Sequence, residues 1–151
     1  MNKKKRKDYP RKANSHDSHP TDKWLRDMFL AWFDPCPLNY DYSPAKDVDG
    51  LKIDWKFHTF VNPPYSDPLP WVRKAIREQA KGCSVVLLLK HDSSTHWYKL
   101  LHEAGANILL INGRLSYGNV KPAAFPSMLA VLTGHRPNPI LKGVIEFDES
   151  E

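Results

Sequence analysis

Uninterrupted apolar runs dominate the middle of the chain. Residues 84–89 read Ser-Val-Val-Leu-Leu-Leu, and 106–111 and 127–132 are further apolar runs of strand length. Residues 57–61 form a fourth segment that we expect to be a strand. Because apolar residues follow one another without alternation, the runs predict strands covered on both faces, as is usual in a parallel sheet.

Helical spacing occurs before and between these runs. Leu25, Met28, Phe29 and Trp32 recur at i, i+3, i+4 and i+7, and Thr21 is of a type that caps helices. The spacing predicts a helix that turns one face toward the core.

A second helix is predicted to begin near Pro68 or Pro70 and to end at Gly82. Its predicted buried face consists of Val72, Ala75, Ile76 and Ala80, and its predicted exposed face of Arg73, Lys74, Arg77 and Glu78. A third predicted helix buries Trp97, Leu100, Leu101 and Ala104 and ends at Gly105. The alternation of strands and helices predicts an α/β fold with a mostly parallel, doubly wound sheet and right-handed crossovers.

Composition divides the chain into three parts. Residues 1–20 are rich in charge, proline, serine and histidine and lack the apolar surface that would offset their ordering entropy, so we expect a flexible basic arm. Residues 21–132 are expected to form one compact domain. Residues 133–151 are expected to be a C-terminal extension with a short edge strand near 141–147 and an acidic end.

The positive charge is concentrated in the arm. The formal net charge is +5, and all of it lies in residues 1–20, because the remaining residues are neutral in sum. The cluster Lys3, Lys4, Lys5, Arg6 and Lys7 can neutralise DNA phosphates without reading base sequence. A solvated tail or a nuclear-import signal has the same composition.

Several function classes have no signal in the sequence. No apolar run approaches the roughly 18 residues that cross a bilayer, and no signal peptide is visible, so we expect a soluble, cytoplasmic protein without a membrane partner. Cys36 and Cys83 are too far apart for a Cys-x-x-Cys pair, and the seven histidines lack the spacing of metal ligands. We therefore expect reduced thiols and no metal.

The main chemical motif is Asn62-Pro63-Pro64-Tyr65, directly after the strand predicted at 57–61. The exocyclic amine of adenine is a poor nucleophile because its lone pair is delocalised into the ring. Hydrogen bonds from this amine to the Asn62 side-chain oxygen and the Pro63 carbonyl would favour a pyramidal nitrogen that can attack a sulfonium methyl group. The two prolines restrict the turn, and Tyr65 offers a flat face on which a flipped base can stack.

The motif has other interpretations. A rigid turn after a strand has the same composition, and a motif match requires structural context. The substrate is not fixed either, because glutamine amides and other planar amines share the delocalised nitrogen of adenine.

Ordered matches from about residue 21 to 132 resemble the phage-type, Dam-like DNA N6-adenine methyltransferases. The matching residues are Trp24, Leu25, Asp34–Cys36, Asp54, Trp55, Phe60–Ser66, Pro70–Val72, Val85–Leu89, Trp97, Gly113–Leu115, Tyr117, Gly118 and Phe125–Ser127. The resemblance implies a Rossmann-like fold, S-adenosylmethionine as cofactor and DNA adenine as substrate. For a phage-encoded protein it also implies the cytoplasm of a bacterial host.

The resemblance also implies a cofactor site. Asp34, with Pro35 and Cys36, is similar to the family's first cofactor-binding segment, where a carboxylate can meet the ammonium group of the cofactor. The alternative for Asp34 is a loop acid in solvent. Asp47 or Asp49 can accept ribose hydroxyls, although simple solvation is the expected role of an acid in a polar loop.

Residues 113–118 lie between the last two predicted strands. Arg114 is a candidate phosphate contact, and Tyr117 is a candidate for the lining of the base pocket. A hairpin-like connection without a functional role is an equal alternative.

Two departures from the family pattern stand out. The Phe-x-Gly-x-Gly loop common in methyltransferases is absent, and Lys90-His91-Asp92 replaces the usual proline-containing turn. His91 and His96 are expected to be surface residues, because the methylated amine loses its proton readily without a strong base. Four of the five tryptophans are expected in the core, and Trp55 is the one expected near a ligand.

Two other functions therefore stay open. A degenerate methyltransferase scaffold could bind DNA without catalysis, and the same active site could methylate RNA adenine or protein glutamine. The sequence predicts neither the target DNA sequence nor the oligomeric state.

Overall fold

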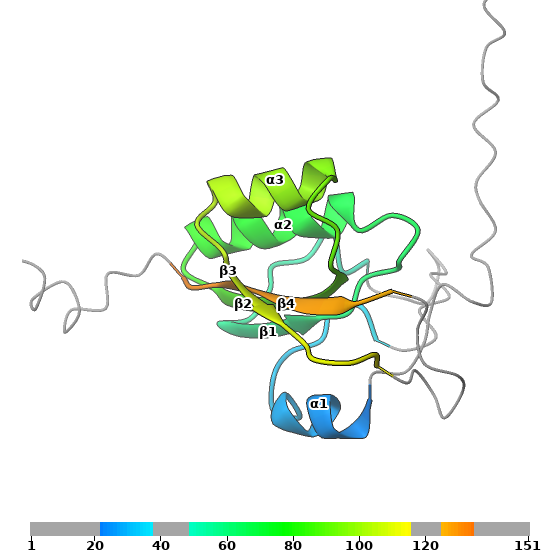
Figure 1. Ribbon diagram of the computed structural model, residues 1–151. Coiled ribbons are helices and arrows are strands. Elements are labelled where there is room, and N and C mark those ends of the chain that lie inside the picture. Colours follow the sequence, from blue (N-terminus) through cyan, green and yellow to red (C-terminus); the bar gives the residue numbers. More distant parts are fainter. Residues whose placement is uncertain (1–21, 38–48, 116–124, 135–151) are drawn as a thin grey trace, which may run out of the picture.

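The described part of the protein contains one sheet with helices on both of its faces (Figure 1). The computed structural model describes residues 22–37, 49–115 and 125–134. The elements are α1 (Lys23–Met28), β1 (His58–Val61), α2 (Leu69–Ala80), β2 (Ser84–Lys90), α3 (His96–Glu103), β3 (Asn107–Leu110) and β4 (Ser127–Leu132). Helices α2 and α3 cover one face of the sheet, and α1 lies on the other side. The predicted α/β class is confirmed.

The sheet is mixed, with the strand order β1-β2-β4-β3. Strands β1 and β2 are parallel, whereas β4 is antiparallel to both of its neighbours. Thus β1, β2 and β3 point in one direction, and β4 runs against them between β2 and β3. The prediction of a mostly parallel sheet missed this insertion, because an apolar run reports burial on both faces and not strand direction.

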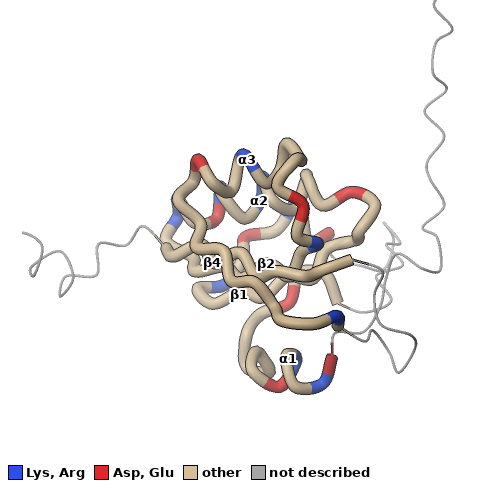
Figure 2. The backbone as a smooth tube through the Cα atoms, viewed as in Figure 1, with Lys and Arg blue, Asp and Glu red and all other residues tan. Residues whose placement is uncertain are grey.

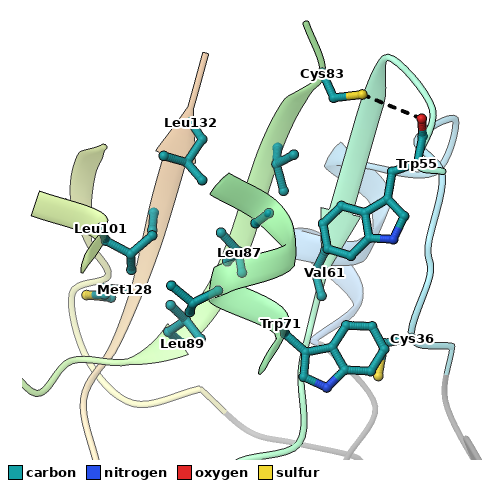
Figure 3. Packing of buried hydrophobic residues seen from close by; sticks show 14 residues of the cluster. Cys36, Trp55, Val61, Trp71, Cys83, Leu87, Leu89, Leu101, Met128 and Leu132 are labelled. Carbon is teal, nitrogen blue, oxygen red and sulfur yellow. Dashed lines mark hydrogen bonds between the residues drawn. The ribbon is translucent and has the colours of Figure 1, made fainter. Parts of the chain in front are cut away.

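Strand β2 is the centre of the core, as its apolar run predicts. Its residues at 85–89 are at most 4% exposed. Val85, Leu87 and Leu89 belong to the cluster that includes residues of α2 and α3, and Val86 and Leu88 belong to the cluster that includes Leu25 of α1 (Figure 3 shows the first of these). Both faces of this strand are therefore covered.

Helix α2 departs from its predicted amphipathic pattern. It begins after Pro68 and is followed by Gly82, whose φ of 103° explains why glycine stands there. Lys74 and Glu78, however, were predicted on the exposed face and are 5% and 1% exposed. The reason is that residue Trp55 packs beside this face, so α2 contacts protein on a second side.

Helix α1 is shorter than its sequence pattern indicates. It ends at Met28, which is 62% exposed, and Leu25 is its buried residue. Phe29 follows the helix and stacks on Phe60 of β1 with ring centroids 4.5 Å apart. Phe29 therefore contacts the sheet as predicted, but from outside the helix.

Several predictions lie outside the described residues. These are the basic arm at 1–20 and the edge strand near 141–147, so the domain boundaries stay predictions. Among residues that the structure does describe, no helix has the length and apolar character to cross a bilayer.

Candidate active site

Two segments far apart in the sequence meet at the edge of the sheet where β1 ends. Phe33 forms a parallel bridge to β1: its N–H donates to the His58 carbonyl at 3.0 Å, and the Phe60 N–H donates to the Phe33 carbonyl at 2.9 Å. Because the two segments run in the same direction, Asp34 leaves the bridge at the edge where Asn62 leaves β1. The structure thus brings the two predicted site segments to one edge.

The Asn62-Pro63-Pro64-Tyr65 motif forms the turn between β1 and α2. Asn62 is half-buried and Pro63 is buried. The Pro64 carbonyl accepts a hydrogen bond from the Asp67 N–H at 3.3 Å, which closes the turn. The prolines lack an N–H and have a restricted φ, so the strand ends here. The predicted position of the motif directly after a strand is confirmed.

A cavity of about 180 Å³ opens beside this turn. Its lining residues are Pro63, Pro64, Tyr65, Ser66, Pro68, Leu89, Lys90, Asp92, Thr95 and Trp97. They come from the turn after β1, the end of β2 and the beginning of α3. Asn62 is not a lining residue but directly precedes Pro63. The volume is below the roughly 300–1,000 Å³ of pockets for drug-sized ligands, so the cavity has room for one small group.

The Tyr65 ring, which lines the cavity, packs against a second aromatic ring. The Tyr65 and Phe125 rings meet edge to face with centroids 5.1 Å apart. The Lys90 ammonium lies 5.9 Å from the centroid of the Phe125 ring, a cation–π arrangement. Tyr65 therefore lines the cavity with its ring held against Phe125, and its role in stacking on a base stays a prediction.

Lys90, Asp92 and Trp97 were not predicted as site residues. A signal for the first two was present, because Lys90 ends and Asp92 follows a strand that is parallel to β1 and so ends at the same edge. Trp97 was expected in the core, yet it is half-buried and lines the cavity from the first turn of α3.

Asp92 carries a stable negative charge at the cavity. The hydroxyl of Ser94 donates to its carboxylate at 2.5 Å, and the Ser94 N–H donates to the same oxygen at 3.1 Å. These hydrogen bonds lower the pKa of Asp92. The cavity thus has one cationic and one anionic side chain at the end of β2.

Asp34 is the exposed member of its segment. The Cys36 N–H donates to the Asp34 Oδ1 at 2.9 Å, so the carboxylate caps its own turn. Surrounding protein atoms raise the pKa of Asp34, and the hydrogen bond from Cys36 lowers it in part. Pro35 and Cys36 are buried. Of the three residues, Asp34 is therefore the one that can reach a ligand with its side chain.

Cys36 should resist alkylation in the folded protein. Burial, together with the charge of Asp34, raises the pKa of its thiol from 9.0 to about 12, so only about one thiol in 10,000 is ionised at pH 8. We expect iodoacetamide to label Cys36 at least about a hundredfold more slowly in the native protein than in urea. Mass spectrometry of labelled peptides measures this ratio, and equal native and denatured rates would contradict the burial of this thiol.

Of the two acidic residues that are candidates for binding the ribose, the structure describes one. Asp49 is half-buried, accepts the Leu51 N–H at 2.9 Å and has the Lys52 ammonium 3.7 Å away. Asp47 lies outside the described residues. Asp49 thus shapes its own loop, and its role toward a ribose stays a prediction.

The predicted nucleic-acid contacts are mostly not described. Arg114 is exposed beyond β3 and does not line the cavity. Tyr117 and the cluster Lys3–Lys7 lie outside the described residues. Residues 113–118 belong to the connection between β3 and β4. These strands are antiparallel neighbours, as the hairpin-like alternative requires. His96 is exposed as predicted, whereas His91 is half-buried and packs against Tyr98.

Two expectations about tryptophan are wrong. Trp55 was expected near a ligand, but it is 5% exposed and belongs to the core. Trp24 was expected in the core, but it is 53% exposed on α1. Within the described ranges, no group of three or more His, Cys, Asp or Glu residues is arranged to hold a metal ion.

Comparison with known proteins shows two relatives encoded by phages. Over 72 residues, 46% of the chain, it is 36% identical to a DNA N-6-adenine-methyltransferase of Haemophilus phage HP1 (strain HP1c1), covering 42% of that protein. Over 74 residues, 48% of the chain, it is 36% identical to a DNA N-6-adenine-methyltransferase of Escherichia phage T1, covering 31% of that protein. The matched region thus spans less than half the length of these curated relatives. No solved structure gives a significant match.

The family match covers the motif and the cavity. Residues 39–128, more than half of the chain, match the family described as DNA N-6-adenine-methyltransferase (Dam). This range contains the turn after β1, the end of β2 and the beginning of α3. The resemblance noted from the sequence is confirmed, and the chain belongs to the DNA N-6-adenine-methyltransferase (Dam) family.

Proposed function

We propose that this chain transfers a methyl group from S-adenosylmethionine to the N6 amine of adenine in DNA. One observation carries the proposal: the Asn62-Pro63-Pro64-Tyr65 turn leaves β1 beside a cavity, at the edge where Asp34 also emerges. Family membership and the names of the two phage relatives support adenine N6 as the acceptor.

The proposed roles at the turn follow from the chemistry of the amine. The side-chain oxygen of Asn62 and the carbonyl of Pro63 accept the two amine hydrogens and favour a pyramidal nitrogen. Tyr65 stacks on the base, and the neighbouring Phe125 ring holds the Tyr65 ring in place. Pro63, which is buried, and Pro64 restrict the turn and so fix the spacing between these groups.

The residues at the edge also fit the proposed cofactor. S-adenosylmethionine supplies a methyl group bonded to a positively charged sulfur. Asp34 is exposed at the same edge as Asn62 and can accept hydrogen bonds from the cofactor's ammonium group. Asp49 is a second proposed acceptor, for the ribose hydroxyls. Helices on both faces of the sheet are compatible with the Rossmann-like fold that we propose for the chain.

The proposed reaction has a direct test. Labelled S-adenosylmethionine is incubated with the protein and, separately, duplex DNA, RNA and a protein extract. We expect label in DNA, recovered as N6-methyladenine. Label in RNA alone or in protein alone would show that the substrate is RNA or protein and not DNA. Absence of both cofactor binding and label would favour the non-catalytic scaffold, which the missing glycine-rich loop supports.

The basic arm is proposed to bind DNA through phosphates. If its five clustered charges each contact a phosphate, deletion of residues 1–20 should reduce the slope of log affinity against log salt by about 4.5, from about 0.9 per contact. Fluorescence anisotropy over a salt series measures the slope. Lys99→Gln, at an exposed position of α3, is the matched control and should change the slope little. An unchanged slope after deletion would rule out this role.

A further inference from the structure

A chain of buried contacts connects helix α2 to the Asp34 segment. We propose that Trp55 and Gly50 are positioning residues that hold the Asp34-Pro35-Cys36 turn in the conformation that binds S-adenosylmethionine. This inference rests on the proposed cofactor role of Asp34. Neither residue touches the proposed ligand, and each acts through the backbone of Pro35.

Trp55 is fixed from α2 and from the beginning of β2. The backbone N–H of Trp55 donates to the Glu78 Oε2 at 3.2 Å. Its backbone carbonyl lies 3.5 Å from the Cys83 sulfur, the dashed contact in Figure 3. Its ring stacks near Trp71 with centroids 6.4 Å apart, and the Lys74 ammonium lies 5.8 Å from the ring centroid. The indole therefore has a single orientation set by the core.

In that orientation the indole N–H points at the backbone of Gly50. The Trp55 Nε1 donates to the Gly50 carbonyl at 2.7 Å. This is a buried hydrogen bond between an aromatic side chain and a loop backbone. It therefore holds the Gly50 backbone at a fixed distance from the core. The loop residue Gly50 is itself buried.

Gly50 in turn contacts the backbone of Pro35. A Cβ at position 50 would lie 2.0 Å from the Pro35 carbonyl oxygen and 2.9 Å from its carbonyl carbon. Only glycine allows the two backbones to approach this closely. Since Pro35 stands between Asp34 and Cys36, whose N–H binds the Asp34 carboxylate at 2.9 Å, movement of Pro35 would reorient that carboxylate.

The test removes the link while keeping the aromatic ring. Trp55→Phe deletes the Nε1 donor, and we expect the dissociation constant for S-adenosylmethionine to rise roughly three- to tenfold by calorimetry. The Cys36 amide should exchange with deuterium faster, because its acceptor Asp34 is less well held. DNA affinity measured without cofactor should not change.

Gln79→Met is the matched control. The Gln79 side chain is 4% exposed and donates to the Thr133 carbonyl at 2.9 Å, so this variant also loses a buried hydrogen bond between a side chain and the backbone. Gln79 has no link to Pro35 among the described contacts. We expect a similar loss of thermal stability in both variants, with cofactor affinity and Cys36 exchange changed in Trp55→Phe alone.

A second variant tests the contact between Gly50 and Pro35. Gly50→Ala should weaken cofactor binding at least as much as Trp55→Phe, because its Cβ must displace the Pro35 carbonyl. It also serves if Trp55→Phe does not fold. Unchanged cofactor affinity and Cys36 exchange in a folded variant would overturn the positioning role. Failure of the unaltered protein to bind the cofactor would instead overturn the proposed function.

Discussion

Asn62→Ala should reduce the rate of methyl transfer to DNA by at least about a hundredfold, the usual cost of losing one preorganised hydrogen-bond partner at a reacting group. Alanine keeps the turn, because the prolines that shape it are retained. The acceptor for the adenine amine is lost, so the amine's lone pair stays delocalised into the ring. The effect should appear in kcat, since the interaction matters most at the reacting nitrogen.

The measurement is single-turnover transfer of labelled methyl groups to duplex DNA, with cofactor affinity measured by calorimetry on the same samples. Cofactor affinity should change little. Asn112→Ala removes an exposed asparagine beyond β3 and should retain the full rate. Transfer at the normal rate by Asn62→Ala would remove this residue from the active site.

Glu78→Leu should destabilise the fold by about 3–5 kcal/mol, as is typical when one partner of a buried ion pair is removed. The Glu78 side chain is buried and its carboxylate pairs with the ammonium of Lys74, which is buried with it. The Lys81 ammonium lies 3.1 Å from the same oxygen, and the Trp55 N–H donates to the other at 3.2 Å. Leucine would leave Lys74 without its carboxylate inside the protein.

Denaturant titration measures this loss, and the double variant Lys74→Met, Glu78→Leu should recover most of it by removing the isolated charge. Asp54→Asn is a control at the surface, where the side chain is 87% exposed and pairs with Lys81. It should have little effect. Equal stability of the single and double variants would show that the unpaired Lys74 charge is not the cause of the destabilisation.

The same carboxylate predicts a response to acid. Burial raises the pKa of Glu78, but hydrogen bonds from Lys74, Lys81 and the Trp55 N–H together lower it below its ordinary value of 4.5. A pKa that is lower in the folded state adds stability above pH 4.5 and loses it as the pH falls through the folded value. The Glu78→Leu variant should therefore lose less stability than the unaltered protein as the pH falls from above 4.5 through the folded pKa of Glu78.

The sequence predicted local elements better than the contacts between them. A proline pair after a strand, and the covered run at 84–89, are local signals, and both are confirmed. The Phe33 bridge that brings Asp34 to the edge of the sheet is a contact between segments 26 residues apart. Periodicity reports the faces of an element and not its neighbours.

The errors have the same origin. Lys74 and Glu78 looked like an exposed pair at helical spacing, and burial of that face depends on where Trp55 packs. Trp24 and Trp55 exchanged their expected environments, since an aromatic residue in a polar stretch is buried only if the fold places the stretch against the core. Tertiary contacts decided these positions.

The insertion of β4 between β2 and β3 has a consequence for synthesis on the ribosome. Strand β3 pairs with β4 in the described sheet, and β4 is the later of the two in the chain. A nascent chain that ends before residue 127 therefore displays β3 with unpaired backbone N–H and C=O groups, before its neighbouring strand exists. Cotranslational folding of the sheet must wait for residue 132 to leave the exit tunnel, and premature termination upstream should yield insoluble fragments.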